Sequence, residues 1–276
     1  MAELEIISHR GEWVSNSKEL KLPQNVARQH TRAAFESAMA NRFGVEFDLM
    51  PGLSNGVSVI AITAAYPYDD DNNNFEFPSG TLTLPELLEL RRDFSADGQY
   101  PGTAYFDMKQ GRDRLEAARL VGVYEEKDHR IINVQNPSDW SWFAKTTEFK
   151  DKVVRLYDDE NPLLPGSEKT AVFRQAGGIM LNAMNPFEEG GLKAWMDMAD
   201  RALANGKNEV LFSLGDITGW GINPHEHDEN KQPYRRKAVE MFPMLQDIVA
   251  KHPNAEIKIL TNFPRWARDH FGPVLG

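Results

Sequence analysis

The sequence predicts an α/β protein, specifically a (β/α)8 TIM barrel with a small insertion after the second strand. Strand-like and helix-like segments alternate along the chain, giving eight strands interleaved with helices over about 270 residues, a length typical of one barrel. A doubly wound open sheet is the alternative, but the first strand-to-helix turn lacks its Gly-rich phosphate fingerprint. No internal repeat or linker divides the chain, so we expect a single domain over 1–276, with the insertion at about 50–80.

Composition narrows the class of protein. The chain has 276 residues, of which 41% are hydrophobic and 26% charged, as in soluble globular domains. A net charge of -10 argues against binding to nucleic acid or to anionic membrane surfaces. The absence of cysteine excludes disulfides, thiolate metal sites and a cysteine nucleophile. We expect no transmembrane segment and no signal peptide, so a cytoplasmic location and a mature exported form both stay open.

The first elements form a strand, helix, strand unit. Residues 4–8 are strand-like and lead into His9, Arg10 and Gly11. An amphipathic helix is expected over about 27–41, because apolar side chains recur there at helical spacing. A buried strand follows at 43–49. This order favours parallel strands.

The segment over 50–80 interrupts the alternation. It contains a strand candidate at 57–62 and an acidic, Asn-rich run at 69–74. A connection of this length is typical of a functional lid or an inserted subdomain. Thr83 then predicts the start of a helix that runs to about residue 94, with Pro85 and Glu86 in its first turn.

The alternation continues from the third barrel strand, at 103–109, to the end of the chain. Further strands are expected at 130–134, 153–156, 178–181, 209–214 and 256–260. Helices are expected at 113–126, around Trp140 and Phe143, at 168–175, 192–204 and 235–251, and in a short final segment. A loop over 215–234 separates the seventh strand from the next helix.

Polar residues collect at the strand ends, where barrel enzymes place their sites. They are His9 and Arg10, Glu46 and Asp48, Asp107 and Lys109, and Asn262. Glu46 and Asp48 share one face of their strand because successive side chains alternate.

The residue types predict a cation next to an anionic substrate. Glu46, Asp48 and Asp107 would form an all-oxygen pocket suited to Mg²⁺ or Ca²⁺. Arg10 and Lys109 favour phosphate, and His9 would be a nucleophile or a general acid/base. The alternatives are solvated acids, an Asp107–Lys109 ion pair, or a barrel enzyme of sugar or enolate chemistry.

In these features the chain resembles the glycerophosphodiester phosphodiesterase family of PLC-like phosphodiesterase TIM barrels, which includes toxin-like phospholipase D relatives. The matching residues are His9-Arg10-Gly11, Pro23-Gln24-Asn25, Thr31, Ala34-Phe35, Glu46, Asp48, Thr83 to Leu88, Asp107, Lys109, Thr261-Asn262 and Pro264. The resemblance implies one divalent cation, Mg²⁺ or Ca²⁺, held by Glu46, Asp48 and Asp107.

It also implies the substrate and the reaction. The substrate would be a small glycerophosphodiester or a lysophospholipid, cleaved by hydrolysis or by a lyase reaction that forms a cyclic phosphate. His9, Arg10 and Lys109 would be catalytic, and Arg10 and Lys109 would contact the phosphate. Trp220 and Asn262 are further candidates for substrate binding; Trp220 would be either an apolar wall of the site or a packed anchor of its loop. Asp107, where many of the hydrolases have Glu, leans toward the lyase reaction.

Three positions depart from the family pattern: Gln24 replaces Glu, Asn262 replaces a common Asp, and no histidine occurs in 59–65. The second catalytic histidine of the family would lie there. Three explanations stay open: an altered catalytic position, a catalytically impaired phosphodiester-binding pseudoenzyme, or replacement by His225 or His227 in the loop after the seventh strand. We interpret the remaining histidines as structural residues on helices or turns; they are His30, His129, His252 and His270.

Overall fold

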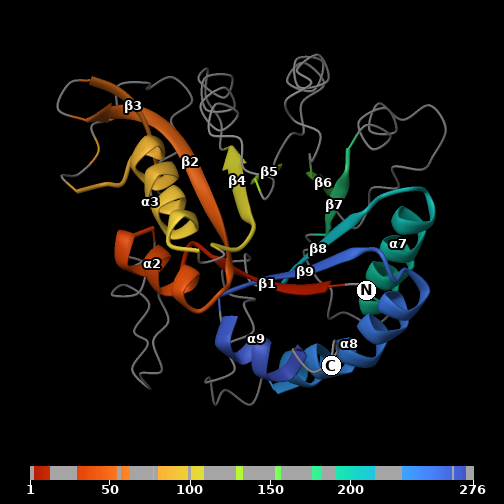
Figure 1. Ribbon diagram of the computed structural model, residues 1–276. Helices are drawn as coiled ribbons and strands as arrows, with labels where there is room; N and C mark the ends of the chain where they lie inside the picture. Colours follow the sequence, from red (N-terminus) through yellow and green to blue (C-terminus); the bar gives the residue numbers. More distant parts are fainter. Residues whose placement is uncertain are drawn as a thin grey trace. The chain divides into compact units, whose positions relative to one another are not determined.

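The structure is a computed structural model. It describes residues 3–12, 30–54, 57–62, 77, 80–98, 101–108, 129–132, 153–156, 176–181, 191–214, 232–262 and 264–271. The chain forms two compact units (Figure 1): one joins Met1–Ile7 to Val134–Gly276, and the other comprises Ser8–Asn133. The first strand, β1 (Glu3–His9), contributes to both.

The Ser8–Asn133 unit contains a sheet with the strand order β5-β4-β2. Its elements are α2 (Arg32–Ala40), β2 (Gly44–Ser54), β3 (Val57–Ile62), α3 (Leu84–Ala96), β4 (Ala104–Met108) and β5 (His129–Ile132). β2 pairs in parallel with β4, and β4 with β5. β3 pairs antiparallel with β2, so β2 and β3 form a hairpin. The sequence between the paired Ser54 and Val57 is Asn-Gly, which favours a two-residue hairpin turn.

Capping residues set the ends of the two helices of this unit. The Ala34 backbone N–H donates to the Thr31 hydroxyl at 3.2 Å, so α2 begins at Arg32. At the start of α3, the backbone N–H and the hydroxyl of Thr83 donate to Glu86 Oε2 at 2.8 and 2.7 Å. The backbone bond and then the hydroxyl bond lower the pKa of Glu86, because they stabilise its charged form.

Three aromatic rings, one pair edge-to-face and one pair stacked, lie in the core of the Ser8–Asn133 unit. The ring centroids of Phe35 on α2 and Phe47 on β2 are 4.8 Å apart, and those of Phe47 and Phe106 on β4 are 5.5 Å apart. All three side chains are fully buried. Each such burial stabilises the fold by about 1.5–3 kcal/mol, so this core holds α2, β2 and β4 together.

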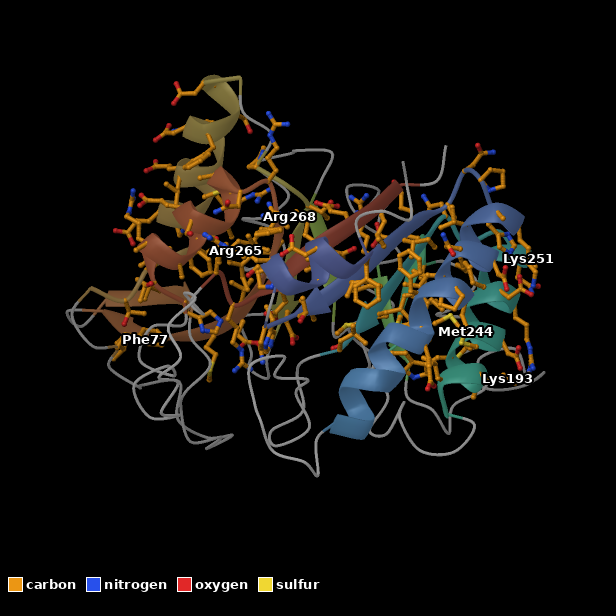
Figure 2. The ribbon with its side chains drawn as sticks, turned by 90° about the horizontal axis from the view of Figure 1, so that it is seen from below. Phe77, Lys193, Met244, Lys251, Arg265 and Arg268 are labelled. Atoms are coloured by element: carbon orange, nitrogen blue, oxygen red, sulfur yellow. The ribbon has the colours of Figure 1, made fainter. Side chains whose placement is uncertain are left out.

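The other unit contains parallel strands in the order β9-β8-β7-β6, with the Glu3–Ile7 part of β1 beside β9. Its elements are β6 (Val153–Leu156), β7 (Gly178–Leu181), α7 (Gly191–Ala204), β8 (Glu209–Ser213), α8 (Gln232–Lys251), β9 (Glu256–Thr261) and α9 (Pro264–Phe271). α7 packs on β7 and β8, α9 packs on β9, and α8 contacts α7 and α9. Figure 2 shows Lys193 and Lys251 on the neighbouring helices α7 and α8.

Three predicted boundaries are wrong. The helix predicted from residue 27 does not include His30 and Thr31, because Thr31 has extended backbone geometry and caps α2. The second strand continues to Ser54 instead of ending near Leu49, because it pairs with β3. The loop predicted to reach residue 234 ends earlier, since α8 starts at Gln232; a proline at the next position is compatible with a first helical turn.

The predicted strands are otherwise found at their places, as are α3, α7 and α9. The helices predicted at 113–126, around Trp140 and at 168–175 lie outside the described residues. The prediction of an α/β protein with parallel strands is confirmed. Closure of eight strands into a barrel, the insertion at 50–80 and a single domain over 1–276 stay predictions. Among the described helices, none is both long and apolar enough to cross a bilayer.

Candidate active site

Three carboxylates converge where β2 and β4 run side by side. The parallel register places Glu46 opposite Tyr105 and Asp48 opposite Asp107. Because side chains at paired positions of parallel strands point to the same face, the carboxylates of Asp48 and Asp107 are neighbours, and Glu46 shares that face at two residues' distance. One ligand oxygen of each of the three residues lies within 4.8 Å of the others.

This acidic cluster fits a hard divalent cation. Glu46, Asp48 and Asp107 are 2%, 0% and 3% exposed, so their charges are removed from water. Buried like charges repel one another and need positive charge or protons nearby. The donors are oxygens only, as Mg²⁺ and Ca²⁺ prefer. In the part of the chain that the structure describes, it is the one group of acidic or histidine side chains with this geometry.

His9, the last residue of β1, and Arg10, which follows it, lie against the acidic cluster. His9 Nε2 lies 3.7 Å from Glu46 Oε2, and Arg10 Nε lies 2.8 Å from Asp48 Oδ2. The Arg10 backbone N–H donates to the Glu46 carbonyl at 3.2 Å. The predicted association of His9 and Arg10 with Glu46 and Asp48 is therefore present in the structure.

α2 holds the turn that carries Arg10. Gly11 has φ +85°, and a Cβ at this position would come within 2.9 Å of Ala34 Cβ and of Phe35, so only glycine fits without a shift of the helix. The next residue, Glu12, is buried and accepts hydrogen bonds from Ser37 Oγ at 2.7 Å and Asn41 Nδ2 at 2.9 Å. These contacts fix the turn, and with it Arg10, on α2.

His30 is a site residue that the sequence analysis missed. It lies in the turn before α2 with φ 56°, and its Nε2 is 3.4 Å from Asp48 Oδ2. The sequence predicts a helix at this position and a structural role for the histidine. The sequence contained one indication of its true place: Thr31 is a favourable N-cap, and a cap there leaves His30 in the preceding turn.

None of the other predicted site residues is among the described residues of the Ser8–Asn133 unit. Lys109 and Trp220 lie outside the described residues, as do His225 and His227. Asn262 follows directly after β9 and is half-buried, in the unit that does not contain the acidic cluster. Their roles stay predictions.

Three solved structures are similar to this chain in fold. The chain is similar to a glycerophosphodiester phosphodiesterase from Agrobacterium tumefaciens, with 16% identity, coverage of 99% of both chains and a TM-score of 0.55. A protein from Galdieria sulphuraria assigned to the same activity has 14% identity, 98% coverage of both chains and a TM-score of 0.55. One from Silicibacter pomeroyi, assigned as a glycerophosphoryl diester phosphodiesterase, has 13% identity, coverage of 99% of this chain and 94% of that chain, and a TM-score of 0.56.

The chain therefore has the fold of the glycerophosphodiester phosphodiesterases over almost its whole length, and the resemblance seen in the sequence is confirmed at the level of the fold. The sequence itself matches no protein-family model and no curated protein. Identities this low are consistent with motifs that are scattered along the chain instead of forming one continuous stretch.

Proposed function

We propose that the protein is a metal-dependent phosphodiesterase that cleaves a glycerophosphodiester or the headgroup of a lysophospholipid. The observation that carries this proposal is the buried cluster of Glu46, Asp48 and Asp107 with His9 and Arg10 in direct contact with it. The fold shared with glycerophosphodiester phosphodiesterases supports a phosphodiesterase-like function.

Glu46, Asp48 and Asp107 would hold Mg²⁺ or Ca²⁺. When bound, such a cation neutralises charge on the phosphate oxygens and so favours attack on phosphorus. Arg10 and Lys109 would bind the same phosphate through charge-assisted hydrogen bonds. Trp220 and Asn262 would contact the remainder of the substrate.

Among the protein side chains, His9 would take part directly in the reaction. Glu46 lies 3.7 Å from His9 Nε2 and would orient the imidazole toward the phosphate. In hydrolysis, a water oxygen bonds to phosphorus, the bond to the leaving oxygen breaks, and that oxygen takes a proton. In the lyase reaction, a neighbouring hydroxyl of the substrate attacks instead and a cyclic phosphate forms. As a proton-transfer group, His9 would take the proton from the attacking oxygen or give one to the leaving oxygen. As a nucleophile, its ring nitrogen would bond to phosphorus while the bond to the leaving oxygen breaks, and water would then cleave the phosphorus–nitrogen bond.

A phosphodiester-binding protein with impaired catalysis is the second candidate. The observation that favours it lies on β3, where Ile62 pairs with Leu49, next to Asp48. In the family that the sequence resembles, the second catalytic histidine belongs near this position, and this chain has only apolar and small residues from Val59 to Ala65. Such a protein would bind the phosphodiester with little turnover.

The two candidates are separated by assays on glycerophosphocholine and lysophosphatidylcholine with Mg²⁺ or Ca²⁺, and with EDTA. We expect turnover that EDTA abolishes and that His9→Ala lowers by about 10²–10⁴-fold, the usual contribution of a proton-transfer group. ³¹P NMR of the product distinguishes a phosphomonoester from a cyclic phosphate. His252→Ala is the control, because His252 contacts Asp200 in the other unit.

Turnover that persists in EDTA and in His9→Ala would contradict the proposal. Binding of the same phosphodiesters in calorimetry, with no product from any of them, would instead support the phosphodiester-binding protein.

A further inference from the structure

His30 occupies an unusual backbone position beside the acidic cluster. Its φ of 56° lies in the left-handed region, which is uncommon for residues other than glycine but several-fold enriched in histidine. Its backbone N–H donates to the Arg10 carbonyl at 3.1 Å. The turn before α2 is therefore hydrogen-bonded to the turn after β1, and the histidine side chain is directed to β2.

The imidazole of His30 lies against Asp48 of the acidic cluster. His30 Nε2 lies 3.4 Å from the Asp48 backbone nitrogen and 3.4 Å from Asp48 Oδ2. With a proton on Nε2 the imidazole donates to Oδ2, and without one it accepts from the backbone N–H, so either tautomer bonds the ring to Asp48. The ring packs edge-on against Phe35, with centroids 6.2 Å apart and an interplanar angle of 71°. The side chain is 5% exposed, so these neighbours leave it little room to turn.

Asp48 Oδ2 is thus approached from two sides. Arg10 Nε lies 2.8 Å from it and His30 Nε2 lies 3.4 Å from it. Both nitrogens come from turns that are bonded to each other, and both side chains lie against β2. A carboxylate held in this way keeps one rotamer, and the position of its ligand oxygen is set before a cation arrives.

We propose that His30 is a positioning residue of the cation site: it holds Asp48 in the orientation in which Asp48 shares a cation with Glu46 and Asp107. This inference rests on the proposed function, because it assumes that the cluster binds Mg²⁺ or Ca²⁺. Outer partners of ligating carboxylates typically change metal affinity 10–100-fold when they are removed. His30 has this place in the structure although the segment before α2 gives no metal-site pattern in the sequence.

Two substitutions separate positioning from packing. His30→Phe keeps an aromatic ring against Phe35 but removes Nε2. His30→Gln loses the ring but can place an amide nitrogen or oxygen near the position of Nε2. If His30 only fills space, the Phe variant should bind the cation at least as well as the Gln variant. If His30 positions Asp48, the Gln variant should bind the cation more tightly. The left-handed backbone strains both replacements, so the strain does not distinguish them.

Calorimetric titration of the wild type and both variants with Mg²⁺ and with Ca²⁺ tests the proposal, and thermal denaturation of the cation-free proteins reports packing. We expect His30→Phe to bind the cation about 10–100-fold more weakly than the wild type. His30→Gln should recover most of the affinity, even where its melting temperature is the lower of the two. This reversed order of affinity and stability is the outcome that a packing role does not produce.

Equal cation affinity in the wild type and His30→Phe would overturn the role of His30 and leave the proposed function intact. The same holds if His30→Gln binds no better than His30→Phe while both are folded. A wild type that binds neither Mg²⁺ nor Ca²⁺ would remove the cation site itself, and with it both the proposed function and this inference.

Discussion

At the scale of single residues, backbone strain gathers beside the acidic cluster. Arg10 and His30 have φ values of 63° and 56°. Gly11, which directly follows Arg10, has φ +85°. A residue other than glycine in the left-handed region costs about 1–3 kcal/mol and persists only where its surroundings determine it. Two backbone hydrogen bonds hold these conformations here: the Arg10 N–H donates to the Glu46 carbonyl, and the His30 N–H donates to the Arg10 carbonyl. Strain of this kind is typical of functional sites.

Glu46→Gln tests whether the acidic cluster is a cation site. The substitution keeps the size of the side chain but removes a buried charge and weakens one ligand. We expect weaker binding of Mg²⁺ and Ca²⁺ in calorimetry, by at least about 10-fold, as for a change in the immediate environment of a metal.

Glu89→Gln is the matched control for that prediction. Glu89 is exposed on α3 in the same unit, so its replacement makes the same chemical change away from the cluster. If both variants bind the cation as the wild type does, the cluster is not the cation site.

At the scale of elements, a buried arginine joins α3 to the segment that enters β4. Arg91 is fully buried; its Nη1 donates to the Pro101 carbonyl at 3.2 Å and its Nη2 to the Gly102 carbonyl at 2.7 Å. Gly102 has φ +73°, and a Cβ there would lie 2.5 Å from the Phe43 carbonyl oxygen. The close approach of these two backbones fixes the chain at Gly102, two residues before β4 begins and five residues before Asp107. α3 thus helps to place Asp107 through the segment that precedes β4.

Arg91→Met should destabilise the protein, because it removes two charge-assisted hydrogen bonds and leaves buried carbonyls to find other partners. We expect the free energy of unfolding in urea to fall by about 1.5–3 kcal/mol. Arg92→Met is the control, since the neighbouring Arg92 is exposed on the same helix. Equal stabilities of the two variants would show that the Arg91 contacts contribute little.

At the scale of the whole molecule, each of the two units contains a buried ionic group, but the two groups differ in kind. The Ser8–Asn133 unit has carboxylates arranged for a cation. In the other unit, the buried Lys258 already supplies the cation: its Nζ lies 3.4 Å from Glu5, 3.2 Å from Glu209 and 2.9 Å from Glu256. These residues come from β1, β8 and β9, so the ammonium joins three strands. We therefore assign this group a structural role.

Lys258→Met should be strongly destabilising at neutral pH. Removing one partner of a buried ion pair leaves uncompensated charge and typically costs about 3–5 kcal/mol. Chemical denaturation measures the change. Lys251→Met serves for comparison, because Lys251 is exposed at the end of α8 and lies 3.3 Å from Asp200, an ion pair in contact with water (Figure 2). Surface pairs contribute about 0–1 kcal/mol, so similar losses in the two variants would contradict the structural role of Lys258.

Much of the fold follows from local sequence. The strands could be predicted because each is a short apolar, often β-branched run with turn residues or charges on either side. Glu46, Asp48 and Asp107 could be predicted because paired carboxylates at consecutive strand ends are rare and costly to bury without a cation. The C-terminal end of β2 could not be predicted, because it depends on pairing with β3. The start of α2 could not be predicted, because it depends on the capping bond of Thr31.

The sequence by itself determined the order of the described strands and helices and the residues of the acidic cluster, because periodicity and residue type act within a few neighbouring positions. Only the tertiary structure decided that His30 faces Asp48, 18 residues further along the chain. That contact depends on a left-handed turn, on the bond to Arg10 and on the packing of α2, and none of these has a local pattern. The residues that contact a carboxylate of the cluster are set by packing, while the carboxylate itself is visible in the sequence.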